Sequence, residues 1–139
     1  MIILSIDYGR VRTGIAVCDR NEIVASPVGV IKEYHMDALA DKIVRLAQEH
    51  HAEEIVLGLP RNMDGSEGES AANVRVFREM LCERCALPVI LRDERCTTVT
   101  AYEYLNMNQK RGKKRKEVVD SVAAVIILED YLSYRRNCQ

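Results

Sequence analysis

Apolar residues change their spacing along this chain, and the change divides the predicted secondary structure into two parts. In the first part, three short apolar runs predict strands over residues 2–7, 13–18 and 22–31. Because only short polar turns separate these runs, we expect an antiparallel meander. The third run contains Pro27 and Gly29, so it should lie at the edge of the sheet or be bent.

In the second part, helical spacing alternates with short apolar runs. Strands are expected over 53–60 and 87–94. Helices are expected over 36–50, 97–107 and 117–135. A further helix should begin at a capping box formed by Ser66 and Glu69 and end at about Cys85. Strands that alternate with helices imply parallel pairing with crossovers. The predicted fold class is therefore α/β, a mixed five-stranded sheet (three-strand antiparallel meander plus parallel strands) with helices on both faces. The last helix is apolar over most of its circumference from Val118 to Leu128, which predicts burial on more than one side.

Length and composition are consistent with one globular domain over residues 1–139. The net charge of −1 excludes a uniformly basic nucleic-acid binder, but residues 109–139 carry a net charge of +4. The first residues predict neither a signal peptide nor a membrane span. The 5 cysteines show no disulfide spacing, so we expect a cytoplasmic protein.

Acidic residues stand at the ends of apolar elements. Asp7 ends the first strand, Asp93 and Glu94 end the fifth, and Asp120 lies in the first turn of the last helix. Carboxyl ends of parallel strands meet at one edge of an open α/β sheet, which is where sites gather. Clustered carboxylates require a cation, and oxygen ligands favour Mg²⁺ or Mn²⁺. Two such ions would suit attack of water on a phosphodiester.

Each acid also has a structural interpretation when it is taken alone. Asp7 could form an Asx-turn, Asp120 could stabilise the helix dipole, and Glu94 could pair with Arg95. Taken together, the three acids favour a metal and catalytic site. Adjacent strand residues point to opposite faces, so Asp93 and Glu94 should not both be ligands, and Glu94 is preferred for its longer reach.

Positive charge is concentrated beside these acids. The run KRGKKRK at 110–116 is expected to be a solvated, mobile loop between two helices that can become ordered on a phosphate backbone. Such contacts position a nucleic acid without reading its sequence. The candidate substrate-binding residues are Arg10, Arg12, Arg61, Arg95, Lys113, Lys114, Arg115 and Lys116.

Four segments in order resemble one known family across essentially the whole chain. They are DYGRVRTGIAV (7–17), VLGLPRNMDGSEG (56–68), LRDERCTT (91–98) and KRKEVVDSVAAVIIL (114–128). The sequence is similar to the pre-16S rRNA nuclease family (YqgF-type, Holliday-junction-resolvase-like), which has a ribonuclease H-like fold. The resemblance implies a small cytoplasmic bacterial protein of ribosome biogenesis that processes the 5′ end of the 16S rRNA precursor.

The resemblance also implies a metal-dependent nuclease site at Asp7, Glu94 and Asp120. Junction resolvases of this fold use four carboxylates, and here only three can be placed. The implied partners are structured RNA and the ribosome, with branched DNA as an alternative substrate, no membrane, and a monomer or weak homodimer. For the loop over 58–68, two interpretations stay open: its glycines and Arg61 approach the substrate, or it is a long turn with a helix cap.

Two other functions are compatible with parts of the pattern. A non-catalytic nucleic-acid or ribosome-binding module would use the basic run without cleavage. Sugar kinases and actin also carry an acid and a glycine in their first hairpin, but they need two such domains around a nucleotide. A chain of 139 residues is too short for that arrangement.

Overall fold

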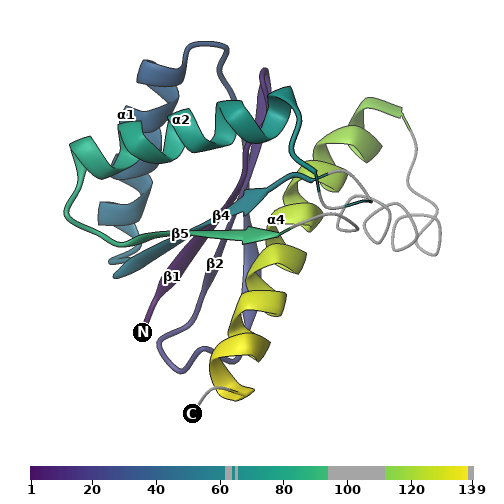
Figure 1. Cartoon of the computed structure of the whole chain (residues 1–139). Helices are drawn as coiled ribbons and strands as arrows, with labels where there is room; N and C mark the ends of the chain where they lie inside the picture. The colour runs from purple at the N-terminus through teal and green to yellow at the C-terminus, as the bar shows by residue number, and fades with distance from the viewer. Residues whose placement is uncertain (62–63, 65, 94–111, 138–139) are drawn as a thin grey trace.

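The computed structural model describes residues 1–61, 64, 66–93 and 112–137, and for helix residues 112–121 it describes the backbone alone. The strands are β1 (Ile3–Asp7), β2 (Arg12–Cys18), β3 (Ala25–Lys32), β4 (Glu54–Leu59) and β5 (Val89–Asp93), and the helices are α1 (Met36–Glu49), α2 (Glu69–Arg84) and α4 (Gly112–Asn137) (Figure 1). The predicted helix over 97–107 lies outside the described residues. The predicted order of the other elements is confirmed.

The five strands form one mixed sheet in the order β3-β2-β1-β4-β5. β1 pairs antiparallel with β2, and β2 with β3, so the predicted meander is confirmed. β1 pairs parallel with β4, and β4 with β5. The carboxyl ends of β1, β4 and β5 therefore share one edge of the sheet. β3 is the outermost strand on one side of the sheet, and its pairing with β2 shifts register near Pro27. Its proline and glycine predicted such a position.

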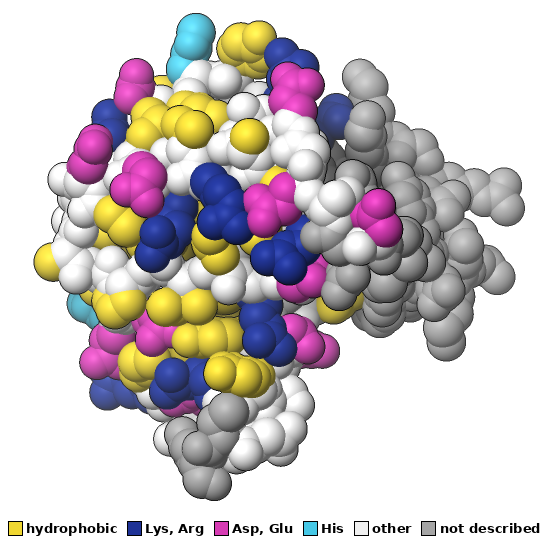
Figure 2. Space-filling view, viewed as in Figure 1, with side chains coloured by type: hydrophobic (Ala, Val, Ile, Leu, Met, Phe, Trp, Pro, Cys, Tyr) yellow, Lys and Arg dark blue, Asp and Glu magenta, His cyan; other side chains and the backbone are white. Residues whose placement is uncertain are grey.

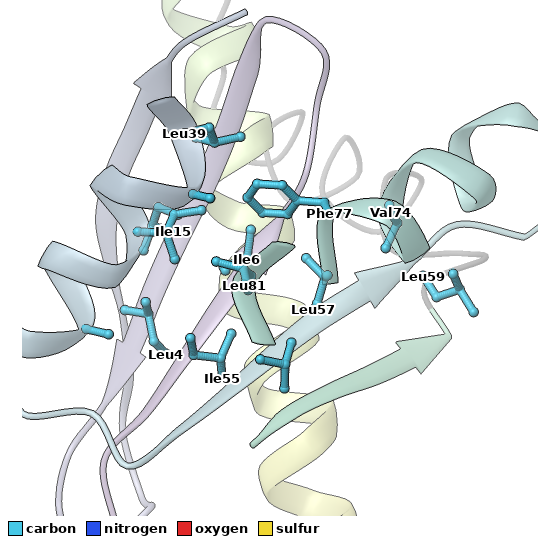
Figure 3. Packing of buried hydrophobic residues seen from close by; sticks show 14 of the residues in the cluster. Leu4, Ile6, Ile15, Leu39, Ile55, Leu57, Leu59, Val74, Phe77 and Leu81 are labelled. Atoms are coloured by element: carbon cyan, nitrogen blue, oxygen red, sulfur yellow. The ribbon is translucent and has the colours of Figure 1, made fainter. Parts of the chain in front are cut away.

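Helices α1 and α2 cover one face of the sheet. Leu4 and Ile6 of β1 point toward this layer and belong to the same buried cluster as Leu39, Ile43 and Phe77 of the two helices (Figure 3). The buried residues of α1 recur with helical spacing, as the apolar pattern predicted. Burial of these apolar side chains is the main stabilising term for this layer.

Helix α4 covers the opposite face and runs antiparallel to β1 (Figure 1). Ile3 and Val56 of the sheet belong to the cluster that contains Ala124 and Leu128 of the helix. The fully buried residues of the described part of α4 are Ala123, Ala124, Ile127, Leu128, Tyr131 and Leu132. They follow one face, and Val125 and Ile126 are only partly buried, so burial on several sides is not found in this part.

Two predicted element boundaries are wrong. Helix α4 begins at Gly112 and not at 117, so residues 112–116 of the basic run are helical and not a loop, and Asp120 is not in the first turn. Lys and Arg have high helix propensity, which allows the helix to extend into this run. Helix α2 has Gly68 as its N-cap without a side-chain bond, whereas the Ser66 hydroxyl bonds to Asp64. The expected capping box is therefore not formed.

None of the helices described here is both long and apolar enough to cross a membrane.

Candidate active site

The carboxylate of Asp7 lies on the α4 side of the sheet, at the carboxyl end of β1. Alternate residues of a strand share a face. Ile3 packs in the α4 cluster, and the Ser5 hydroxyl donates a 2.7 Å hydrogen bond to the carbonyl of Ala124. Asp7 continues this row and pairs with Gly14 of β2, which has no side chain on that face. The sequence prediction that β1 supports a carboxylate at the sheet edge is therefore confirmed for its backbone position.

The position of Asp120 follows from the same hydrogen bond. Asp120 lies in α4 one turn before Ala124, which is about 6 Å along the helix axis. Asp7 lies two strand residues beyond Ser5, a distance of about 7 Å. Because α4 and β1 are antiparallel, both steps lead toward the same edge. The backbone at 120 thus reaches the level of Asp7, although the Asp120 side chain is outside the described part.

Glu94 and Arg95 lie outside the described residues, but the strand that precedes them is described. Asp93 ends β5 and pairs with Leu59 of β4. The Arg92 guanidinium donates a 2.7 Å bond to Asp130 of α4, so Arg92 faces that helix. By strand alternation, Asp93 faces the α1 and α2 layer, away from the Asp7 carboxylate. Asp93 is therefore a poor alternative ligand.

The β1–β2 turn presents Arg10 and Arg12 at this same edge. Gly9 is required here, since a Cβ atom on it would lie 2.1 Å from the carbonyl oxygen of Arg12. The buried Thr13 hydroxyl donates to the Gly9 carbonyl and closes the turn. Arg10 is exposed, and the Nε of Arg12 is buried without a hydrogen-bond partner among the described residues.

Arg61 follows the carboxyl end of β4 and lies against its own loop. Its Nη2 is 3.7 Å from Glu67, which Arg75 binds more closely at 2.7 Å. These arginines, chiefly Arg75, hold the pKa of the Glu67 carboxyl below its usual range. Only 58–61, 64 and 66–68 of this loop are described, so its approach to a substrate stays a prediction.

Lys113, Lys114, Arg115 and Lys116 occupy the first turns of α4, and their side chains lie outside the described part. The N-terminus of α4 is on the Asp7 edge of the sheet because the helix runs antiparallel to β1. On the side of the molecule that Figure 2 shows, positive and negative side chains are interspersed in the described part, with no continuous basic surface. The β1–β2 turn and the backbone at the start of α4 therefore lie at the same edge as Asp7.

The donor chemistry fits a hard divalent cation, but the side chain of only one of the three candidate ligands is described. Among the described side chains, no three His, Cys, Asp or Glu residues converge. Asp7 is the candidate ligand whose side chain is described, and it is partly buried at the sheet edge. Carboxylate oxygens favour Mg²⁺ or Mn²⁺ over softer metals.

Sequence reasoning missed Ser5, whose hydroxyl positions α4 against β1. The signal was present as a serine inside the apolar run IILSID. A polar group that is 0% exposed must find a hydrogen-bond partner, and here the partner is 119 residues away. Which distant residue would be the partner cannot be read from the run itself.

Known proteins of similar sequence carry a nuclease name. A protein named "Putative pre-16S rRNA nuclease" from Streptomyces avermitilis is 41% identical over 134 residues, which cover 96% of this chain and 86% of the relative. A protein of the same name from Agathobacter rectalis is 38% identical over 140 residues, covering 99% of this chain and 98% of the relative.

Solved structures show the fold. Thermus thermophilus RuvC in complex with a Holliday junction substrate aligns with a TM-score of 0.60 at 13% identity, over 98% of this chain and 96% of that one. Fowlpox virus resolvase with Holliday junction DNA also aligns with a TM-score of 0.60 at 13% identity, over 97% and 99% of the two chains. The expected ribonuclease H-like fold is confirmed.

The family model described as "RuvX: Holliday junction resolvase" matches residues 1–134. This match covers both Asp7 at the end of β1 and the whole of the described contact between β1 and α4. Together with the curated relatives, it shows that the chain belongs to the RuvX family of nucleases, as the four sequence segments indicated.

Proposed function

We propose that this protein is a metal-dependent nuclease that hydrolyses phosphodiester bonds of structured RNA and processes the 5′ end of pre-16S rRNA in the cytoplasm. Asp7, Glu94 and Asp120 are the proposed ligands of Mg²⁺ or Mn²⁺ and the catalytic carboxylates. The observation that carries the proposal is the Ser5–Ala124 hydrogen bond, since it aligns position 120 of α4 with Asp7 at one sheet edge. The names of the curated relatives support the choice of substrate.

The acidic and the basic residues at this edge have different proposed roles: the carboxylates hold the metal ions, and the arginines and lysines bind the phosphate backbone. When bound, the divalent ions would polarise the phosphate and stabilise the attacking and leaving oxygens. Asp7 is fixed by a strand that is hydrogen-bonded on both sides, so its carboxylate needs little reorganisation during the reaction. Arg10, Arg12, Arg61, Arg95 and residues Lys113–Lys116 would hold the phosphate backbone, and these contacts are expected to weaken with salt.

The direct test is cleavage of a precursor rRNA fragment by purified protein with Mg²⁺ or Mn²⁺. Asp7→Asn keeps the size of the side chain and removes its charge, so cleavage should fall by at least about 100-fold, as for loss of a transition-state contact. Asp93→Asn is the matched control and should keep most of the activity. Equal cleavage by wild type and Asp7→Asn would refute the assignment of the site.

A second candidate substrate is a four-way DNA junction. The description of the matching family model favours it, since that description names a Holliday junction resolvase. Parallel assays on precursor RNA and on a four-way DNA junction distinguish the two substrates. Salt-sensitive binding to the ribosome or to RNA, without metal-dependent cleavage of either substrate, would instead identify a non-catalytic binding module.

A further inference from the structure

A pocket opens beside the candidate active site, on the other side of the same sheet edge. Its volume is about 230 Å³, and its lining residues are Tyr8, Arg10, Tyr34, Met36, Glu69 and Asn73. They come from the β1–β2 turn directly after β1, from the start of α1 and the segment before it, and from the first turns of α2. Asp7, the candidate acid whose side chain is described, does not line this pocket.

The pocket combines aromatic surface with hydrogen-bonding groups. The Tyr8 ring is held by Phe77 of α2, with ring centroids 5.0 Å apart, so it forms a fixed wall. Tyr34 is 62% exposed as a residue, so it is open to a ligand. The Glu69 carboxylate, the Asn73 amide and the Arg10 guanidinium supply acceptors and donors around the rings.

The size of the pocket limits what can enter it. Pockets for drug-sized ligands are usually about 300–1,000 Å³, so this one suits a single planar group. A nucleobase is such a group, with two faces that stack and an edge that forms hydrogen bonds. Single-stranded nucleic acids are bound in this way, by stacking on aromatic side chains beside positive charge.

The pocket also lies in the right place for a substrate. Tyr8 follows Asp7 directly, and neighbouring strand residues point to opposite faces. The Asp7 carboxylate therefore faces α4 while Tyr8 faces the pocket. Arg10, which we place on the phosphate backbone, also lines the pocket. Burial raises the pKa of the Tyr8 hydroxyl, and the positive charge of Arg10 has a smaller, lowering effect on it.

We propose that this pocket receives an unpaired nucleobase from a nucleotide close to the cleaved bond, with stacking on Tyr34 and Tyr8 and hydrogen bonds to Glu69 and Asn73. The inference rests on the proposed function, since it assigns a specificity pocket to that site. A base in a duplex cannot enter without leaving its stack, which costs free energy. The protein should therefore prefer single-stranded or looped RNA over a continuous duplex.

Binding without divalent ions tests this inference separately from cleavage. Fluorescence anisotropy in a chelating buffer would compare a single-stranded RNA, its duplex, and the single strand with one abasic ribose at each position in turn. Wild type should bind the single strand more tightly than the duplex and should lose affinity for one abasic position. Tyr34→Ala should bind the single strand about 5- to 150-fold more weakly, as for loss of one stacked base, and should be insensitive to the abasic position.

Two variants control for the ring and for folding. Tyr34→Phe keeps the stacking surface and should bind as wild type does. Tyr134→Ala removes another exposed tyrosine, on α4 outside the pocket, and should also leave binding unchanged. If Tyr34→Ala binds the single strand as tightly as wild type, the pocket does not hold a base although the nuclease assignment stands. If wild type binds no RNA in the chelating buffer, this inference fails, and the cleavage assay with Mg²⁺ or Mn²⁺ decides the proposed function separately.

Discussion

The hydroxyl of Ser5 donates a buried 2.7 Å hydrogen bond to the backbone carbonyl of Ala124. This contact joins β1 to α4 across 119 positions of sequence. Apolar packing alone leaves a helix some freedom to slide on a sheet, because it is not directional. A hydrogen bond to one carbonyl removes that freedom and fixes the level of the α4 N-terminus relative to the end of β1.

Replacing Ser5 by alanine should therefore affect activity more than folding. We expect Ser5→Ala to lower the free energy of unfolding by about 1 kcal/mol, the usual net value of one hydrogen bond. Cleavage should fall further than the folded fraction explains, because Asp7 and Asp120 would no longer be held at a fixed level. Urea unfolding and the cleavage rate of precursor RNA measure the two effects. Ser133→Ala, on the exposed side of α4, is the control and should change neither.

The turn between β1 and β2 should tolerate no side chain at Gly9. In Gly9→Ala the new Cβ would meet the carbonyl oxygen of Arg12 at 2.1 Å, so the backbone must shift. We expect a loss of about 1–3 kcal/mol in unfolding free energy, as for other overpacked sites. Gly68→Ser is the matched control. A Cβ at Gly68 meets nothing within 4 Å, and serine is a good N-cap, so urea unfolding should show equal or higher stability.

Local pattern was enough to predict the strands, and the helix boundaries that it missed lie where the local signal fits two structures. Five apolar runs predicted the five strands, and the short turns predicted the meander. The start of α4 was placed too late because a dense positive run suggests a loop, whereas Lys and Arg are good helix formers. The capping box failed because Ser66 bonds to Asp64 within the loop. In each case the local signal was ambiguous between two structures.

The sequence predicted the part of the candidate site that lies at the end of a strand. A carboxylate after an apolar strand could be recognised in Asp7 from sequence, and the choice against Asp93 agrees with the face on which β5 places that residue. The Ser5 bond brings the backbone at position 120 to the level of Asp7, and no spacing rule predicts a contact across 119 residues. The pocket beside Tyr8 likewise needs three separate segments, so no single motif indicates it.

Metal binding should be visible in protein stability as well as in activity. A ligand present at about 100 times its dissociation constant adds roughly 2.7 kcal/mol to the folded state. Mn²⁺ or Mg²⁺ should therefore raise the melting temperature of chelator-treated wild type, and Asp7→Asn should lose this gain. Asp93→Asn should keep it, since Asp93 faces the other side of the sheet. A similar metal-dependent gain in Asp7→Asn would show that the ion binds elsewhere.

A buried network at the opposite end of β1 gives a prediction for alkaline pH. The Tyr131 hydroxyl donates a hydrogen bond to the Glu54 carboxylate, which is 8% exposed. Burial, together with this carboxylate, raises the pKa of Tyr131 to about 12 from its ordinary value of 10.0. The neutral phenol thus stabilises the folded state fully below pH 10, and this contribution is lost as the pH rises to about 12.

Tyr131→Phe should remove that dependence. At neutral pH the variant should be less stable by about 1–3 kcal/mol, because the buried Glu54 carboxylate loses a donor. The stability difference between wild type and variant should then shrink between pH 10 and 12, as measured by urea unfolding at several pH values. A difference that stays constant over this range would show that the phenol does not titrate as assigned.

Replacing the basic residues at the start of α4 should have opposite effects on protein stability and on RNA binding. Lys113, Lys114, Arg115 and Lys116 lie at a helix N-terminus, and the first turn holds no acidic residue. Cations there oppose the helix dipole, at a cost of about 0.3–1 kcal/mol each within the first turn. Replacing all four by glutamine, which has similar helix propensity, should therefore raise the melting temperature slightly at low salt.

The same replacement should weaken binding to RNA, which a purely structural role for these residues would not do. Each phosphate contact to a single strand contributes about 0.7 to the slope of log affinity against log salt, so loss of four contacts should reduce the slope by about 3. Arg136→Gln, at the exposed far end of α4, is the control. It removes a cation that favours the dipole, so stability should fall slightly while the salt slope stays the same. An unchanged slope in the four-residue variant would exclude the start of α4 from the nucleic-acid surface.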